Sequence, residues 1–474
     1  MRMRRSVLLL LAAAACGEPS AVRVSPTDRF VFPATVATTS YRDAQGQDAT
    51  ALLVASGNYD LNYDGATGGT VLSVDPALAT DGGSAGRAGG ELVPLGAGAH
   101  VGSFVGQLAV VDATTCPGTG TASRPPVALV ATRFANEIWR LPMGLDGTLG
   151  PCTGSDCTAS VDARLRDPFG VALACRADGR RRSAFVGYLR SGIGDAGNKT
   201  GWLAELDLDD PAAPARVIEV GAAAVSGLAY DDRTDRLFVL GQPLLSAPIY
   251  VLDLTTCPDG LAACATPAIS DVDLKPLSTG LDLQSIALSN HQDGLARRAY
   301  VSARVYDASL ASLLGSRPSA DADALLLVVD LEERPDGGPS LQVLRWVRIG
   351  TGASQVRVLP VRTPAAGGAP RRDVVVVSST TEGVIAVYDD EQGAVARVVP
   401  VDGATGSPEV GRAPYGLAVD PRLVASADGP AARVYVAASQ QAVVGIVDVP
   451  LDAPGKAHAL RDASGALVRI GGLQ

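Results

Sequence analysis

The sequence is poor in the side chains that enzymes most often use for proton transfer and metal binding. It contains only three histidines among 474 residues, at positions 100, 291 and 458. It also lacks a C-x-x-C-H haem-attachment motif. Because most hydrolytic and redox schemes rely on histidine as a proton carrier, the sequence indicates no catalytic residues. It also indicates no cofactor apart from the calcium ion considered below.

Lysine and aromatic residues are equally scarce. The only lysines are Lys199, Lys275 and Lys456, aromatic residues make up 4% of the chain, and the formal net charge is −10. No stretch forms the basic patch that nucleic-acid binding requires, so we expect no nucleic-acid partner. Glycine and proline are abundant, with 53 and 31 residues. This composition is typical of short strands joined by tight turns and disfavours a helical protein.

The N-terminus has the features of an export signal. Three arginines, at positions 2, 4 and 5, precede an apolar run at residues 7–15 that is too short to span a bilayer as a helix. Small residues then lead to Cys16 in a pattern that resembles a bacterial lipobox, although Leu11 lies farther from the cysteine than in the strict motif. The resemblance implies lipidation of Cys16, and an ordinary signal peptide cut near Cys16 is the alternative.

This signal predicts where the protein resides. Acyl chains on Cys16 would hold the chain at a membrane, since each buried CH₂ contributes about 0.8 kcal/mol. Gly17, rather than aspartate, follows the cysteine, and by enterobacterial sorting habit this points to the outer membrane. We therefore expect a cell-envelope protein that is attached through its N-terminal lipid.

Six cysteines remain when Cys16 is set aside. In an exported protein an even set of this size predicts three disulfides. Two pairs are close enough in sequence to close their own loops, which leaves one longer link. A zinc site is disfavoured, because the spacings are not the short paired kind that zinc sites use. The predicted bridges are Cys152–Cys157, Cys257–Cys264 and Cys116–Cys175.

A unit of three short apolar strands recurs along the chain. It is clearest near the C-terminus, where residues 414–421, 433–437 and 443–448 form its three strands. The turn residues between them predict an antiparallel meander, and an array of such units buries its faces by stacking on neighbours. The first strands of the seven copies contain Ala34–Ala37, Val105–Ala109, Phe169–Leu173, Ser226–Tyr230, Gln284–Leu288, Ser354–Val358 and Gly416–Val419.

Two recurrent residue types in these copies have structural explanations. Glycine or serine in the first strand suits a place where strands crowd around an axis. Aspartate at the end of the third strand suits a bond to its own turn. Residues 108–116 also resemble a third strand, which would shift the count near the N-terminus by one unit. The aspartates in question are Asp75, Asp207, Asp253, Asp330, Asp389 and Asp448.

The repeat resembles the YVTN-type β-propeller repeat, most clearly at residues 412–421, 434–436 and 446–448. The resemblance implies an all-β, seven-bladed β-propeller with four antiparallel strands per blade, closed by an N-terminal strand near residues 21–24. We predict a signal peptide at 1–15, a lipidated N-terminus and linker at 16–30, and the propeller at 31–474. The resemblance implies no single activity, because propellers host many functions.

One loop has the spacing of a calcium site. Asp60, Asn62 and Asp64 place oxygen ligands at alternate positions, and Gly65 allows the sharp turn that follows. The glutamate that usually completes such a loop is missing, because Val71 stands at its position. Two interpretations therefore remain open: a weak calcium site formed by the three oxygen-bearing residues, or a plain turn rich in asparagine, aspartate and glycine.

Two functions are consistent with these features. The first is a monomeric, membrane-anchored envelope lipoprotein whose propeller is a non-enzymatic binding or scaffolding module for another envelope protein or a polysaccharide. The alternative is a metal-dependent lactonase-like or sugar-acid enzyme with its site in the propeller's central channel. That enzyme would need several carboxylates and an asparagine or histidine on one face of the channel. The residues that face the channel therefore distinguish the binding module from the metal-dependent enzyme.

Overall fold

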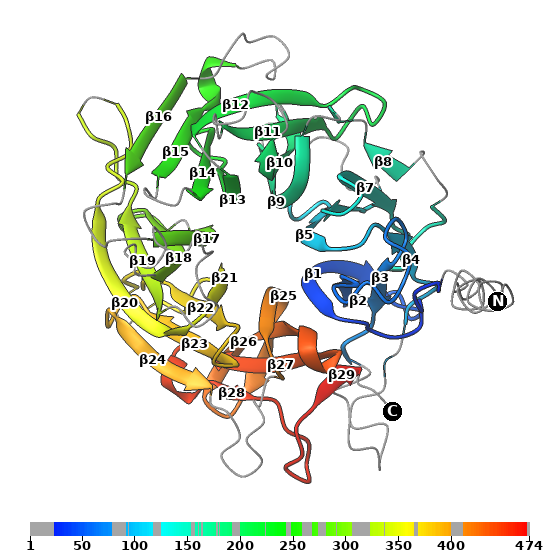
Figure 1. Ribbon diagram of the computed structural model, residues 1–474. Coiled ribbons are helices and arrows are strands. Elements are labelled where there is room, and N and C mark those ends of the chain that lie inside the picture. Colours follow the sequence, from blue (N-terminus) through cyan, green and yellow to red (C-terminus); the bar gives the residue numbers. More distant parts are fainter. Residues whose placement is uncertain are drawn as a thin grey trace, which may run out of the picture.

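The computed structural model is a ring of seven antiparallel β-sheets, or blades, around a central axis (Figure 1). We number the blades 1 to 7 in chain order. The structure describes residues 23–77, 92, 94–116, 125–152, 157–159, 161–162, 165–176, 179, 181–191, 200–222, 224–242, 248–257, 268–273, 281–290, 292–305, 323–335, 337–364, 368–399 and 411–471.

Each blade is a meander whose first strand lies next to the axis and whose last strand lies at the rim. The inner strands are β1 (Pro33–Arg42), β5 (Val105–Val111), β9 (Leu165–Cys175), β13 (Ala224–Asp231), β17 (Leu281–Leu288), β21 (Ala353–Val358) and β25 (Pro414–Ser426). The second strands are β2 (Asp48–Ser56), β6 (Val127–Thr132), β10 (Arg182–Ser191), β14 (Arg236–Gln242), β18 (Arg298–Val305), β22 (Val374–Ser379) and β26 (Gly429–Ala438).

The third and fourth strands complete the blades. The third strands are β3 (Gly69–Val74), β7 (Glu137–Pro142), β11 (Thr200–Asp207), β15 (Pro248–Asp253), β19 (Asp323–Asp330), β23 (Val384–Asp389) and β27 (Val443–Pro450). The rim strands are β4 (Ala99–Val101), β8 (Thr158–Ala159), β12 (Arg216–Ala222), β16 (Ala268–Asp273), β20 (Val343–Thr351), β24 (Ala394–Val399) and β28 (His458–Ala459), with β29 (Arg469–Gly471) also on β27. Short 3₁₀ turns are η3 (Leu254–Thr256), η6 (Ser439–Gln441) and η7 (Pro454–Lys456).

The seven-bladed propeller predicted from the repeats is confirmed. Every predicted first strand forms part of an inner strand, and most sheets have four antiparallel strands. Strand β5 is the inner strand of blade 2, so a third-strand assignment for residues 108–116 is wrong. Within the described residues, no helix has the length and apolarity to cross a membrane.

The middle strands are buried on both faces because each blade is covered by its two neighbours. All six residues of β22 and of β23 are buried, which explains their nearly continuous apolar runs. Val376 and Val387 of blade 6 pack in one cluster with Val434 and Val447 of blade 7. Burial of side chains of this kind contributes about 1.5–3 kcal/mol each. The core is therefore divided among the interfaces between blades.

The glycines of the inner strands allow close approach between neighbouring blades. A Cβ atom on Gly416 would lie 2.7 Å from the carbonyl oxygen of Ala34 and from the Cα of Thr35, both in blade 1. A Cβ on Gly106 would lie 2.8 Å from the carbonyl oxygen of Phe169 in blade 3. These contacts are with backbone atoms that cannot rotate away. The crowding predicted for these positions is therefore confirmed.

The ring closes by contact between blades 7 and 1, and the described part of the predicted N-terminal closing strand is not a strand. Arg23 and Val24 form no strand, residues 21 and 22 lie outside the described residues, and the described strands of blade 7 come from the C-terminal part of the chain. Phe30 packs in the cluster between the two blades. The Thr38 hydroxyl donates to the carbonyl of Val419 at 2.8 Å. Within the described part of the chain, side-chain packing and hydrogen bonds therefore join the ring.

Two of the predicted disulfides are present. Cys116–Cys175 joins the loop after β5 to the end of β9 and so links blades 2 and 3, and Cys152–Cys157 closes a loop within blade 2. Cys257 is also disulfide-bonded. Its predicted partner, Cys264, lies outside the described residues.

The aspartates at the ends of the third strands mostly bond their own turns, as predicted. The Asp207 carboxylate, for example, accepts from the backbone N–H groups of Asp209 and Asp210 at 2.7 and 3.1 Å. Asp448 differs, because the Arg433 guanidinium binds it through two donors at 2.8 and 2.9 Å. The five that accept from their own turns are Asp75, Asp207, Asp253, Asp330 and Asp389.

Candidate functional site

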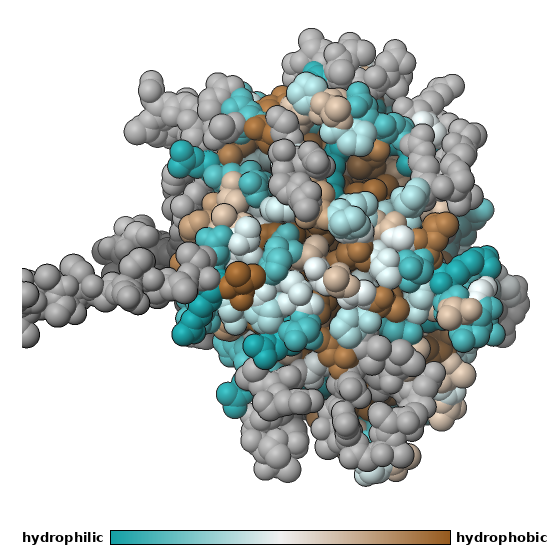
Figure 2. All heavy atoms as spheres, turned by 90° about the vertical axis from the view of Figure 1, so that its right-hand side faces the viewer, coloured by the Kyte–Doolittle hydropathy of each residue, from teal (hydrophilic) through white to brown (hydrophobic). Residues whose placement is uncertain are grey.

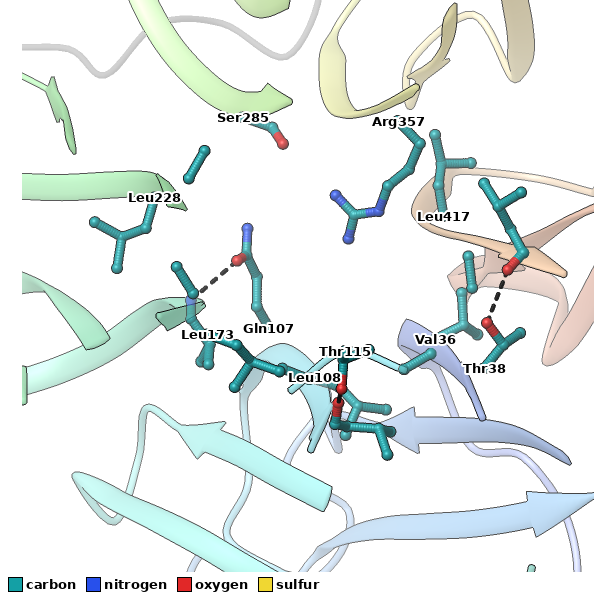
Figure 3. A pocket seen from close by; sticks show the side chains of 18 of the residues that line it. Val36, Thr38, Gln107, Leu108, Thr115, Leu173, Leu228, Ser285, Arg357 and Leu417 are labelled. Carbon is teal, nitrogen blue, oxygen red and sulfur yellow. Dashed lines mark hydrogen bonds between the residues drawn. The ribbon is translucent and has the colours of Figure 1, made fainter. Parts of the chain in front are cut away.

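The central axis holds a cavity to which all seven inner strands contribute. Its volume is 340 Å³, and most of its lining side chains are aliphatic (Figure 3). On the side of the ring that Figure 2 presents, hydrophobic residues occur in several separate places among hydrophilic ones. The axial cavity is therefore the better candidate for a binding site, because it is concave and largely apolar.

A pair of adjacent residues recurs on the inner strands, and in five blades both of its members line the cavity. On each inner strand one apolar residue packs toward the preceding blade, and the next residue faces the other way. In six blades this second residue is alanine, whereas blade 6 has Arg357. The cross-strand register supports the alignment, because Arg357 pairs with Val376 as Ala418 pairs with Tyr435. The six alanines are Ala37, Ala109, Ala172, Ala229, Ala287 and Ala418.

Arg357 is the only charged side chain among the described residues that line the cavity. Its side chain points into the open space (Figure 3), and Nη1 donates to the carbonyl oxygen of Val356 at 3.1 Å. No carboxylate of the described lining compensates the guanidinium. Burial consequently lowers the pKa of Arg357 to about 10. The cavity therefore presents a single uncompensated positive charge.

Two neutral donors accompany this charge. The Gln107 side-chain oxygen accepts from the backbone N–H of Val171 at 3.0 Å, and this bond turns its amide nitrogen toward the cavity (Figure 3). The Ser285 hydroxyl points into the same space. Gln355 makes the equivalent bond, since its oxygen accepts from the N–H of Leu417 at 2.8 Å, but its amide nitrogen is buried without a hydrogen-bond partner. Blades 2, 5 and 6 thus each direct one donor at a common volume.

A second set of polar side chains lies at the end of the axis where the inner strands begin. Arg133 forms an ion pair with Asp167, with Nη2 at 3.2 Å from Oδ2, and its guanidinium lies 5.7 Å from the ring centroid of Phe169. Asp282 lies at the same end, near Arg304. Burial raises the pKa of Asp282 to about 6, and Arg304 opposes this effect. The charges of these two arginines and two aspartates cancel, whereas the charge of Arg357 in the cavity is not compensated.

The predicted calcium residues lie in the loop between β2 and β3, on the same end of the propeller. The Asp64 carboxylate accepts from the N–H and hydroxyl of Thr67 at 3.1 and 2.7 Å, which lowers its pKa. The Asn62 amide donates to the Asp60 carboxylate. Both carboxylates therefore have partners within the loop, an arrangement that suits the plain-turn interpretation as well as a calcium loop that rearranges on binding.

The remaining predictions from the sequence concern Cys16, Cys264 and a metal in the central channel. Cys16 and Cys264 lie outside the described residues. Among the residues that the structure does describe, no group of three or more histidines, cysteines, aspartates or glutamates is arranged to hold a metal ion. The lining of the cavity likewise gives the metal-dependent alternative no ligands there. The sequence prediction missed Arg357, although the departure from alanine in the sixth copy was a visible signal.

Comparisons with known proteins assign neither a family nor a function to this chain. No protein-family model matches the chain, and no curated protein matches it. Among solved structures, Sqt1 from Chaetomium thermophilum is 14% identical with a TM-score of 0.49, over 95% of this chain and 90% of that one. The dihydro-heme d1 dehydrogenase NirN is 12% identical with a TM-score of 0.45, over 97% and 76%. Similarity at this level carries no information about ligand or activity.

Proposed function

We propose that this protein is a cell-envelope lipoprotein whose YVTN-type propeller is a non-enzymatic binding module. The observation that carries the proposal is the chemistry of the axial cavity. Its described lining consists of aliphatic side chains, a few hydroxyl and amide groups and one guanidinium, and these groups can hold a ligand but include no carboxylate, imidazole or thiol for acid–base or nucleophilic chemistry.

Two further features support an envelope location. Disulfides form and persist in oxidising compartments, and Cys116–Cys175 is a link between two blades whose loss would affect the ring. The lipobox-like sequence before Cys16 supplies the expected anchor. A propeller attached through an N-terminal linker would present its axial cavity and loops to other envelope components.

The anchor is tested with the Cys16→Ser variant and with globomycin, which blocks lipoprotein signal cleavage. We expect globomycin to cause accumulation of the uncleaved precursor, and the variant to lose acyl labelling and to leave the membrane fraction. The variant should keep its folded circular-dichroism spectrum, because Cys16 precedes the propeller strands. Continued acyl labelling of the variant would contradict the assignment.

The binding role is tested by crosslinking in intact cells followed by purification of the wild-type protein. We expect a reproducible envelope protein or polysaccharide that is recovered with the wild type. The matched control is the Cys16→Ser protein, which has the same propeller without the anchor and so reports on contacts that depend on membrane attachment. If neither form retains any envelope component, the binding-module proposal is wrong.

A further inference from the structure

We propose that the axial cavity binds a small monocarboxylate with an apolar body, and that Arg357 is the counter-ion of its carboxylate. This inference deepens the proposed function and rests on it. The cavity volume of 340 Å³ lies within the range of small-molecule sites. Its apolar lining would surround a hydrocarbon body, while its charge and donors are confined to a few side chains.

The polar groups of the cavity suit an anion better than a cation or a neutral molecule. The Arg357 guanidinium, the Gln107 amide nitrogen and the Ser285 hydroxyl come from three different blades and point into one space (Figure 3). All three are able to donate hydrogen bonds. Because no carboxylate lies among the described lining residues, a bound anion would supply the negative charge that the protein itself lacks there.

The number and shape of these donors favour a monocarboxylate over phosphate. A guanidinium presents two parallel N–H groups that match the two oxygens of a carboxylate. One such group balances one negative charge, whereas a phosphate dianion would leave a charge uncompensated among aliphatic side chains. Gln107 is also fixed by its bond to the Val171 N–H, so its amide is already oriented before a ligand enters.

The position of Arg357 indicates a role in binding rather than in folding. The other six blades have alanine at the equivalent place, and five of these alanines line the cavity. Arginine here places an unpaired charge beside apolar groups, which is unfavourable in the free protein. Arg357→Ala should therefore keep or raise the melting temperature while it removes ligand binding, a combination that a structural arginine would not give.

The test measures binding of benzoate and octanoate by calorimetry or ligand-observed NMR, with benzamide, octanamide and inorganic phosphate as comparison probes. For the wild-type protein we expect both carboxylates to bind at least tenfold more tightly than their amides and than phosphate. Arg357→Ala should weaken carboxylate binding at least tenfold, and Ser285→Ala should weaken it to a smaller extent. The matched control is Arg397→Ala, which removes an exposed arginine from β24 and should leave binding unchanged.

Several results would overturn the inference. They are equal carboxylate affinity in the wild type and Arg357→Ala, equal affinity for acid and amide, phosphate binding as tight as benzoate, or no carboxylate binding at millimolar concentration. A marked loss of melting temperature in Arg357→Ala would also contradict it, because that would make the arginine structural. None of these outcomes affects acyl labelling or recovery of an envelope partner, so failure here is distinguishable from failure of the proposed function.

Discussion

The Arg362 guanidinium lies 2.8 Å from the Asp389 carboxylate, and each of these side chains is only 1% exposed. Arg362 comes from the loop between β21 and β22, and Asp389 ends β23, so the pair fixes that loop to the third strand of blade 6. Asp389 also accepts from the backbone N–H of Glu391 at 3.0 Å. The pair is thus a buried ionic contact within one blade, and it lies among the loops that follow the inner strands.

Removing one partner of this pair should be costly. Asp389→Asn would leave the Arg362 charge buried with only the half-exposed Glu391 nearby. We expect the free energy of unfolding to fall by about 1–3 kcal/mol, because Arg362 loses its fully buried counter-ion and keeps only the more exposed Glu391. Urea unfolding followed by circular dichroism measures the change.

The surface arginine Arg371 is the matched control for this measurement. Its side chain is 20% exposed and it contacts Glu391 and Asp452 at 3.0 and 2.8 Å. Arg371→Ala should cost about 1 kcal/mol or less. The double variant Arg362→Met, Asp389→Leu should recover part of the loss seen in Asp389→Asn. If Asp389→Asn and Arg371→Ala lower the free energy of unfolding equally, the prediction that the buried ion pair is the more important one is contradicted.

The two disulfides should differ in their contribution to stability. In the chain-entropy description a bridge constrains the unfolded chain more when its loop is longer. The sequence separation is 59 residues for Cys116–Cys175 and 5 for Cys152–Cys157. We expect losses of about 4 kcal/mol and about 2 kcal/mol, respectively, when each pair is replaced by alanine. Urea unfolding of the two double variants measures this order, and a reversed order would contradict the prediction.

The third predicted bridge is tested by mass. Three bridges remove two hydrogens each, so the mature protein without reductant should be six hydrogens lighter than its fully reduced form. Two or more free thiols in the unreduced protein would contradict the three-bridge prediction. Replacement of Cys257 and Cys264 by alanine is the control, because it should reduce the mass difference by two hydrogens.

The blades could be predicted well from the sequence because each copy of the repeat packs against its neighbours in the same way. Gly416 and Gly106 meet the backbone of a neighbouring blade, so the first strand of each copy keeps a recognisable pattern. The closure of the ring could not be predicted in the same way. It depends on a few contacts, such as Thr38 with Val419 and the packing of Phe30, which occur once and leave no repeated signal.

The candidate site was harder to predict than the fold for a geometric reason. Gln107, Ser285 and Arg357 are far apart in sequence, and they converge only because the blades form a closed ring (Figure 3). The side of an inner strand that a residue faces also depends on register shifts, such as the one between Val105 and Leu108. The alanine-to-arginine change at position 357 was visible in the sequence, but its orientation was not.

Asp282 should make stability depend on pH at the end of the axis where the inner strands begin. Its pKa is raised from 3.8 to about 6 by burial, while Arg304 and Gln284 oppose the shift and Tyr415 lies close by. Between these two values the folded protein holds a proton that the unfolded chain has released. This contribution to stability therefore falls as the pH rises through that window.

The Asp282→Asn variant isolates this effect. It should raise the free energy of unfolding by about 1–2 kcal/mol at pH 7.5, because it removes a carboxylate that burial disfavours. The gain should vanish at pH 4 and below, where the carboxylate is protonated. Urea unfolding at both pH values measures it. Asp462→Asn is the control, since this exposed carboxylate has its pKa lowered by Ser464 and should give no gain at pH 7.5. Equal gains at the two pH values would contradict the prediction.

The loop that contains Asp60, Asn62 and Asp64 is either a weak calcium site or a plain turn, and calcium binding distinguishes the two. The sequence predicts weak calcium binding, in the range of about 10⁻⁴–10⁻³ M, because only two carboxylates and no bidentate glutamate are present. The structure adds a condition, since Oδ2 of the Asp64 carboxylate accepts from Thr67 and a metal would share this carboxylate with it. At calcium concentrations tenfold above the dissociation constant, binding would add about 1.4 kcal/mol to stability.

Thermal melting in millimolar calcium and in chelator measures this contribution. We expect calcium to raise the midpoint of the wild-type protein by about 1–2 °C, a small shift because the unfolding entropy of so large a propeller is large. Asp60→Ala should abolish that rise, because it removes one of the two carboxylates. Asp462→Ala is the matched control, since Asp462 bonds its own turn through Ser464 and Ala466 but lacks the alternating oxygen ligands, so calcium should still raise its midpoint. A wild-type midpoint that does not change with calcium would leave the plain turn as the explanation of the loop.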